Sequence, residues 1–147
     1  MFASLVVGTD GSDTATEAVR QAGALAANLG AKVHLVSAYE PVPERRLRDE
    51  HNRPRPDLEW MMHPREAVNT TLDEARRIVA QSGVEVDTHA REGDPADAIL
   101  DVAEEQDADL IVVGNKGMTG AKRFLLGSVP NKISHHAPCS VMIIRTT

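Results

Sequence analysis

The fold is decided by the stretch Leu110-Ile111-Val112-Val113-Gly114, which Gly117 follows two residues later. Four consecutive apolar residues predict a strand that is buried on both faces, as in a parallel sheet. The glycines end the strand where the chain turns toward a helix. After nine further residues, Gly127 and Ser128 open that helix. Because backbone N–H groups at a helix start bind anions, we expect a phosphate site here.

A second stretch of the same kind lies near the N-terminus. Leu5-Val6-Val7 is followed by Gly8-Thr9-Asp10-Gly11-Ser12, and a helical pattern follows. If the two apolar strands are neighbours, both loops face each other at the carboxyl end of the sheet, where open α/β sheets bind ligands. Asp10 is the only acid at the tip of this loop. It suits a ribose hydroxyl, or a magnesium ion if a polyphosphate is bound.

The order of the elements predicts an α/β fold. Strand-like runs over 2–9, 32–38, 84–90, 109–114 and 140–146 alternate with helical patterns. Such an alternation predicts one domain over residues 1–147, an open parallel sheet with helices on both faces. The third run alternates apolar with polar residues, which indicates an edge strand with one solvated face. The first helix is expected to begin with a capping box formed by Thr14 and Glu17 and to end at Gly30.

The segment 39–62 interrupts this alternation. It contains four prolines and many charges of both signs, without helical or strand periodicity. A loop of this length in a compact domain is usually functional or disordered. We expect a mobile flap, with an ordered binding arm as the alternative.

Composition excludes several classes of protein. The net charge of −6 over 147 residues argues against a nucleic-acid partner. No apolar run approaches the roughly 20 residues that span a bilayer, so we expect no membrane partner. The single cysteine, Cys139, rules out an internal disulfide and is expected to be a buried, inert thiol. Without a charged segment before the first apolar run, a signal peptide is not indicated, and we expect a cytoplasmic protein.

The motifs of common enzyme classes are missing. The sequence has no G-x4-G-K-[S/T] and no G-x-G-x-x-G after its first strand. Its histidines show no spacing to cysteines or carboxylates that suits a metal, so we expect no metal site of protein ligands. No serine lies in a recognisable Ser-His-Asp arrangement. We therefore predict no catalytic residue and favour nucleotide binding without turnover; a slow ATPase or phosphotransferase is the alternative.

The two glycine loops resemble those of the universal stress protein family. The family motif G-x2-G-x9-G-[S/T] is matched by Gly114, Gly117, Gly127 and Ser128. The N-terminal stretch Gly8–Ser12 and the C-terminal Ala137-Pro138 are also similar to the family pattern. The resemblance covers the chain except the segment 39–62. It implies a Rossmann-like, five-stranded parallel sheet in the order 3-2-1-4-5, usually in a homodimer, and a stress-response sensor or regulatory protein that binds ATP or, in some members, cyclic AMP.

The resemblance also implies which residues surround an adenine nucleotide. Asp10 would hold the ribose and the Ala38 backbone would face the adenine. The full set is Gly8, Thr9, Asp10, Ala38, Val113, Gly114, Lys116, Gly117, Gly127, Ser128, Val129 and Pro130. Pro130 departs from the family pattern because proline has no N–H to donate to a phosphate. Cyclic AMP or AMP therefore becomes a credible ligand beside ATP.

The last strand, 140–146, is the predicted assembly surface. Val141-Met142-Ile143-Ile144 is continuously apolar, although the family order puts this strand at a sheet edge. A bare apolar edge favours pairing with another strand. We therefore expect a two-fold homodimer through this strand. The sequence does not identify a downstream protein partner.

Overall fold

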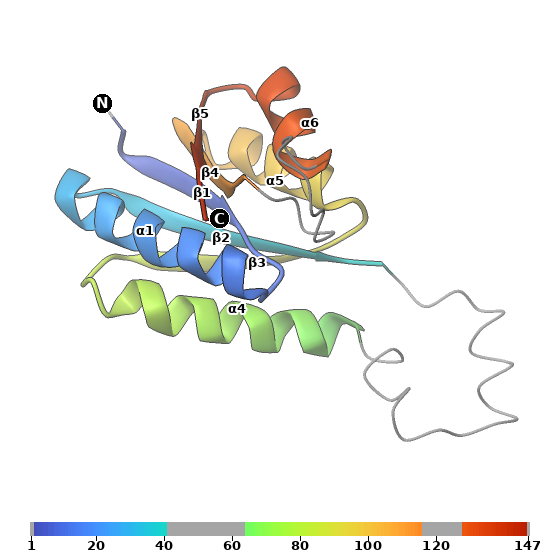
Figure 1. The fold of residues 1–147 in the computed structure, drawn as a ribbon, viewed down its shortest axis with the longest axis horizontal. Helices are drawn as coiled ribbons and strands as arrows, with labels where there is room; N and C mark the ends of the chain where they lie inside the picture. The colour runs from blue at the N-terminus through green and yellow to red at the C-terminus, as the bar shows by residue number, and fades with distance from the viewer. Residues whose placement is uncertain (1, 41–63, 116–127, 147) are drawn as a thin grey trace, which may run out of the picture.

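The computed structural model describes residues 2–40, 64–115 and 128–146. Strands and helices alternate along the chain (Figure 1). In order, they are β1 (Ser4–Gly8), α1 (Asp13–Leu29), β2 (Lys32–Tyr39), α4 (Pro64–Ala80), β3 (Val86–Glu92), α5 (Pro95–Glu105), β4 (Leu110–Gly114), α6 (Ser128–His136) and β5 (Ser140–Ile144). All pairings are parallel, and the strand order is β3-β2-β1-β4-β5. The predicted fold class and strand order are confirmed.

Strand β1 lies at the centre of the sheet, where the strand order reverses. On one side Val6 pairs with His34 of β2, and on the other side it pairs with Ile111 of β4. The chain first winds outward from β1 to β2 and β3, then crosses to β4 and β5 on the other side. In open α/β sheets, ligands bind outside the carboxyl ends of the strands at such a reversal.

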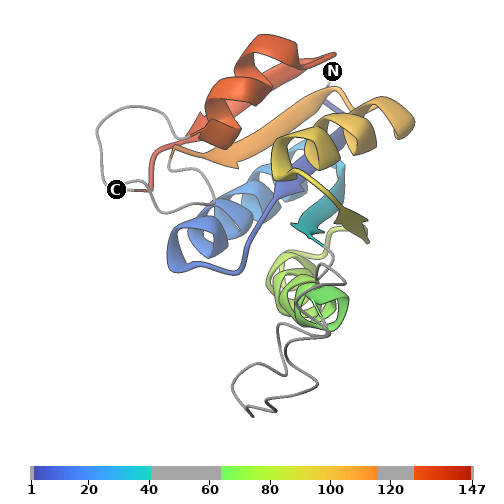
Figure 2. The same ribbon diagram turned by 90° about the vertical axis from the view of Figure 1, so that its right-hand side faces the viewer.

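Helices cover both faces of the sheet (Figure 2). Each face has its own apolar cluster. On one face α1 and α4 pack against alternate strand residues, among them Leu5, Val7 and Leu35. On the other face α5 and α6 pack against residues such as Val6 and Ile111. Because successive strand residues point to opposite faces, the apolar runs are buried from both sides.

The first helix begins differently from the prediction. Its N-cap is Ser12, whose Oγ accepts a hydrogen bond from the Ala15 N–H at 3.3 Å. Thr14 already lies inside the first turn, so the predicted capping box of Thr14 and Glu17 is wrong. Glu17 instead pairs with Arg20 along the helix surface. The C-terminal end is as predicted, with Gly30 in the left-handed conformation at φ 65°.

Both edge strands differ in detail from the predicted ranges. Strand β3 begins at Val86 and continues to Glu92, two residues later than predicted at each end. It is an edge strand, as predicted. The face that we expected to be solvated is only partly exposed, because His89 on that face is half-buried. Strand β5 ends at Ile144, and Met142 and Ile143 are the exposed large apolar side chains of the described residues.

The segment between β2 and α4 was predicted as a flap over 39–62. Tyr39 is the last residue of β2, and Glu40 follows the strand. The remainder of the predicted flap lies outside the described residues. None of the helices within 2–40, 64–115 and 128–146 has the length and apolar content needed to cross a bilayer.

Candidate functional site

The carboxyl ends of β1, β2 and β4 lie side by side at one edge of the molecule. Gly8 pairs with Val36, so Ala38 extends two residues beyond Gly8 on the neighbouring strand. On the other side of β1, Val7 pairs with Val112, and β4 continues to Gly114. Three predicted positions from separate parts of the chain, Gly8, Ala38 and Gly114, are therefore brought to the same end of the sheet.

The loop after β1 is held by its own side chains. Thr9 is buried; its N–H donates to the Val36 carbonyl at 2.9 Å and its Oγ1 accepts from the Gly11 N–H at 3.2 Å. Asp10 is exposed, and its Oδ1 accepts from the Ser12 N–H at 2.9 Å. A carboxylate has two oxygens, so Asp10 can hold this turn and still accept a hydrogen bond from a ligand hydroxyl.

Gly11 adopts a conformation that side chains rarely take. Its φ is 82°, and a Cβ at this position would lie 3.1 Å from both Cγ2 and Oγ1 of Thr71 in α4. The glycine thus allows the loop to turn sharply and to pass close to α4. Because Ser12 caps α1 directly afterwards, this turn determines where the positive end of α1 lies.

The end of β4 is tied to β5. The Asn115 N–H donates to the Ile144 carbonyl at 2.9 Å. The Asn115 Oδ1 accepts from the N–H of Thr146 at 2.8 Å and from its Oγ1 at 3.2 Å. These bonds fix the direction of the chain at Asn115, a residue for which no sequence motif indicated a role.

The first turn of α6 supplies three further predicted residues. Ser128 is exposed, whereas Val129 and Pro130 are buried. Val129 belongs to the same apolar cluster as Val113, with Ala38 packed against its edge. The start of α6 therefore belongs to the apolar core on the face of the sheet that α5 also covers. Pro130 fits here because the first N–H groups of a helix have no partner within the helix.

An ion pair that the sequence did not reveal fixes α6 to α5. Lys132 Nζ lies 2.8 Å from Asp97 Oδ1 and 3.4 Å from Asp94 Oδ2. Asp94 is also the N-cap of α5 and accepts from the Asp97 N–H at 3.1 Å. That backbone hydrogen bond, with help from Lys132, holds the pKa of Asp94 below its ordinary value. Lys132 thereby helps to position α6 on α5. Asp94 lies 38 positions earlier in the sequence, so only the fold brings it close to Lys132.

The remaining predicted positions are only partly described. Lys116, Gly117 and Gly127 lie outside the described residues. Across the ranges that are described, no three histidine, cysteine or acidic side chains are grouped so as to hold a metal. Cys139, predicted to be buried, is half-buried because it precedes the edge strand β5; burial raises the pKa of its thiol.

Together, the sheet order, the loop after β1 and the adjacent end of β4 define a doubly wound α/β fold whose candidate site lies at the reversal of strand order. The model of the universal stress protein family matches residues 1–145. The chain belongs to this family.

Three similar proteins illustrate the match. A universal stress protein of Mycobacterium tuberculosis is 34% identical over 147 residues, covering 99% of this chain and 98% of the relative. A universal stress protein crystallised in complex with cAMP is 32% identical, with a TM-score of 0.73, covering 99% of this chain and 98% of that one. A universal stress protein from Archaeoglobus fulgidus in complex with dAMP is 26% identical, with a TM-score of 0.68 and 98% coverage of both chains.

Proposed function

We propose that this protein binds an adenine nucleotide at the carboxyl ends of β1, β2 and β4 and acts as a regulatory stress-response protein without turnover. The observation that carries the proposal is the meeting of the Gly8–Ser12 loop with Gly114 at the reversal of strand order. Two related structures, named above, contain cAMP and dAMP. We therefore propose adenosine monophosphates as the first ligands to test.

Each predicted residue has a role in this proposal. Asp10 accepts a hydrogen bond from the ribose, and the Ala38 backbone faces the adenine. The phosphates are surrounded by the main chain of Gly8 and Thr9, the carboxyl end of β4 and the first turn of α6. The phosphate set is Val113, Gly114, Lys116, Gly117, Gly127, Ser128 and Val129.

Pro130 determines the preferred ligand. A proline in the first turn of α6 removes one N–H that could donate to a phosphate oxygen. A triphosphate, with or without magnesium, loses more from this than a single phosphate does. Cyclic AMP or AMP therefore binds at least as well as ATP.

Restoring a donor with Pro130→Thr raises the affinity for ATP relative to cyclic AMP, by at most about 1.5–3 kcal/mol for one charge-assisted hydrogen bond. Competition titrations in which the wild type strongly prefers ATP contradict this part.

Turnover is the alternative use of the same site. A slow ATPase or phosphotransferase needs a general base near the terminal phosphate, and the sequence indicates none. Incubation of the purified protein with labelled ATP distinguishes the two. Recovery of unchanged ATP supports a binding protein, whereas ADP that accumulates in proportion to protein concentration supports the enzyme.

The proposal includes a cytoplasmic homodimer assembled through β5. Met142 and Ile143 are 38% and 36% exposed at a sheet edge. Apolar side chains of this kind on an edge strand favour covering by a second copy of the chain.

The substitution Gly114→Ala tests the site. A methyl group at the end of β4 would lie where the phosphate approaches the main chain. We expect adenine-nucleotide affinity to fall by about tenfold or more, which corresponds to about 1.4 kcal/mol. Gly83→Ala is the matched control, since Gly83 has a φ of 75° and open space around it, beyond the end of α4. Calorimetry that finds unchanged affinity in folded Gly114→Ala would place the ligand elsewhere.

A further inference from the structure

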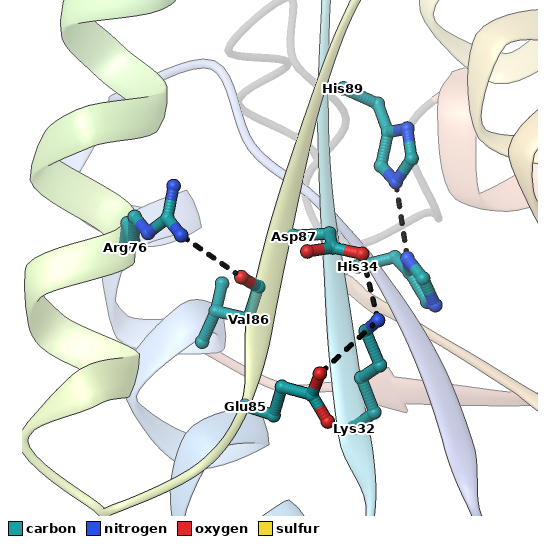
Figure 3. A network of polar contacts seen from close by, with 7 residues as sticks. All are labelled: Lys32, His34, Arg76, Glu85, Val86, Asp87 and His89. Carbon is teal, nitrogen blue, oxygen red and sulfur yellow. Dashed lines mark hydrogen bonds and ion pairs between the residues drawn. The ribbon is translucent and has the colours of Figure 1, made fainter.

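Two histidines from adjacent strands form a hydrogen bond that the proposed nucleotide site does not use (Figure 3). His34 of β2 and His89 of β3 lie on the face of the sheet that α5 covers. The His34 Nδ1 and His89 Nε2 atoms are 3.1 Å apart, and the ring centroids are 5.2 Å apart. His34 is only 3% exposed, and His89 is half-buried.

This hydrogen bond depends on the protonation of the two rings. An N–H···N bond needs one nitrogen that donates and one that accepts. It forms when both rings are neutral or when one proton is shared between them. With both rings protonated, all four ring nitrogens are donors, so the bond is lost and two positive charges face each other.

The charged groups around the pair come from β2, β3 and α5. Lys32 of β2 lies 2.8 Å from Asp87 and 3.6 Å from Glu85, which precedes β3. Arg91 of β3 donates two hydrogen bonds to Glu105 of α5. Asp101 of α5 also acts on Arg91.

Lys32 and Arg91 are each paired with a carboxylate, and the four carboxylates outnumber these two cations. The excess of negative charge partly offsets the repulsion between two protonated rings, but it does not remove the cost of burying them. Burial lowers the pKa of His34, and the neighbouring His89 lowers it further. Burial also lowers the pKa of His89, with Arg91 as the next cause. Burial and the repulsion between the two rings therefore disfavour the second proton in the folded protein.

The position of the pair in the sheet gives it a structural role. Strand β3 is an edge strand, and among the strands that the structure describes it pairs with β2 alone. The pair His34–His89 and the ion pair Lys32–Asp87 connect these two strands through side chains. Edge strands open more readily than central strands, since a single ladder holds them.

We propose that His34 and His89 form a proton-sensitive catch that ties the edge strand β3 to β2 while at least one ring is neutral and releases it when both are protonated. Because the folded pKa values lie below the ordinary value of 6.5, the stabilisation is complete above pH 6.5. It is lost as the pH falls below 6.5 toward the folded values.

Urea unfolding of the full chain between pH 7 and pH 5 tests the catch. The key variant is His89→Gln, whose amide can accept a hydrogen bond from protonated His34 without titrating itself. His135→Gln is the matched control, because His135 is exposed on α6, away from the pair. We expect acidification to raise the unfolding constant of the wild type about tenfold more than that of His89→Gln, since one excluded proton changes this constant by up to tenfold per pH unit.

The control is expected to follow the wild type. An equal pH dependence of the wild type and His89→Gln overturns the proposal. If His89→Gln does not fold, NMR of the wild type decides. Two results together support the catch. The two rings titrate as a coupled pair below pH 6.5, and amide exchange, corrected for intrinsic rates, becomes faster in β3 than in β1. Independent titration at the ordinary value, or β3 exchange that is insensitive to ring protonation, overturns it.

Discussion

Replacing Gly11 with alanine tests how the loop after β1 is built. At a φ of 82°, a non-glycine residue costs about 1–2 kcal/mol, of which about 0.4–1 kcal/mol is offset because alanine restricts the unfolded chain. The new Cβ also lies 3.1 Å from Thr71 Cγ2 and Oγ1, tighter than an ordinary contact. We estimate about 1 kcal/mol more for this overpacking, at the lower end of the range for buried sites. The total loss of unfolding free energy is about 2 kcal/mol.

A matched glycine separates the two effects. Gly30 also has a positive φ, 65°, but nothing lies within 4 Å of a Cβ built there. Gly30→Ala should therefore cost about 1 kcal/mol from the backbone alone. Thr71→Ala removes both crowding atoms and leaves the Thr71 Cβ at 3.7 Å, an ordinary distance. In the double variant Gly11→Ala with Thr71→Ala, about 1 kcal/mol should be recovered as a coupling energy.

Urea unfolding of the four variants and the wild type measures these values, and 1 kcal/mol corresponds to about 2–4 °C in Tm for a chain of this size. A Gly11→Ala variant no less stable than Gly30→Ala, or a coupling energy of zero, would refute the contact between the loop and α4.

Three further predictions test the framework of the site and the proposed assembly. Asp94→Ala removes the N-cap of α5 and should lower the unfolding free energy by about 1 kcal/mol in urea titrations, whereas Asp97→Ala keeps the cap and should cost less. Asp109→Ala should cost about 1 kcal/mol at pH 7, since this carboxylate accepts from two backbone N–H groups at the start of β1. Burial would raise the pKa of Asp109, but these hydrogen bonds hold it below 3.8. The cost should therefore persist above that value and shrink as the pH falls below it; a constant cost from pH 7 to pH 2 would contradict this reasoning. Ile143→Lys on β5 should shift a wild-type dimer toward monomer in sedimentation at micromolar concentration, and a wild-type monomer there would refute assembly through this edge.

The fold could be predicted because its signals are local. Runs such as Leu110–Val113 identify buried strands by themselves, and the alternation with helical patterns restricts the topology. The errors arose where two local signals compete. Ser12 and Thr14 can both cap a helix, and only the backbone decided for Ser12. The start of β3 was placed too early because Val84 and Glu85 continue the alternation before the strand begins.

Contacts between distant segments could not be predicted in the same way. His34 and His89 are 55 residues apart, and their hydrogen bond depends on the register of β2 and β3. A shift of one residue would place the two rings on opposite faces of the sheet. The ion pair of Lys132 with Asp94 likewise needs the packing of α6 on α5. Single-residue patterns carry no information about such registers.

Calorimetric titration of the wild-type protein with cyclic AMP, AMP and ATP shows whether the protein binds an adenine nucleotide. We expect saturable binding at one site per chain, with cyclic AMP or AMP bound at least as tightly as ATP. We also expect Asp10→Ala to weaken the binding of all three ligands, since each carries the ribose that we propose Asp10 contacts. A folded wild-type protein that binds none of the three nucleotides would contradict the proposed function.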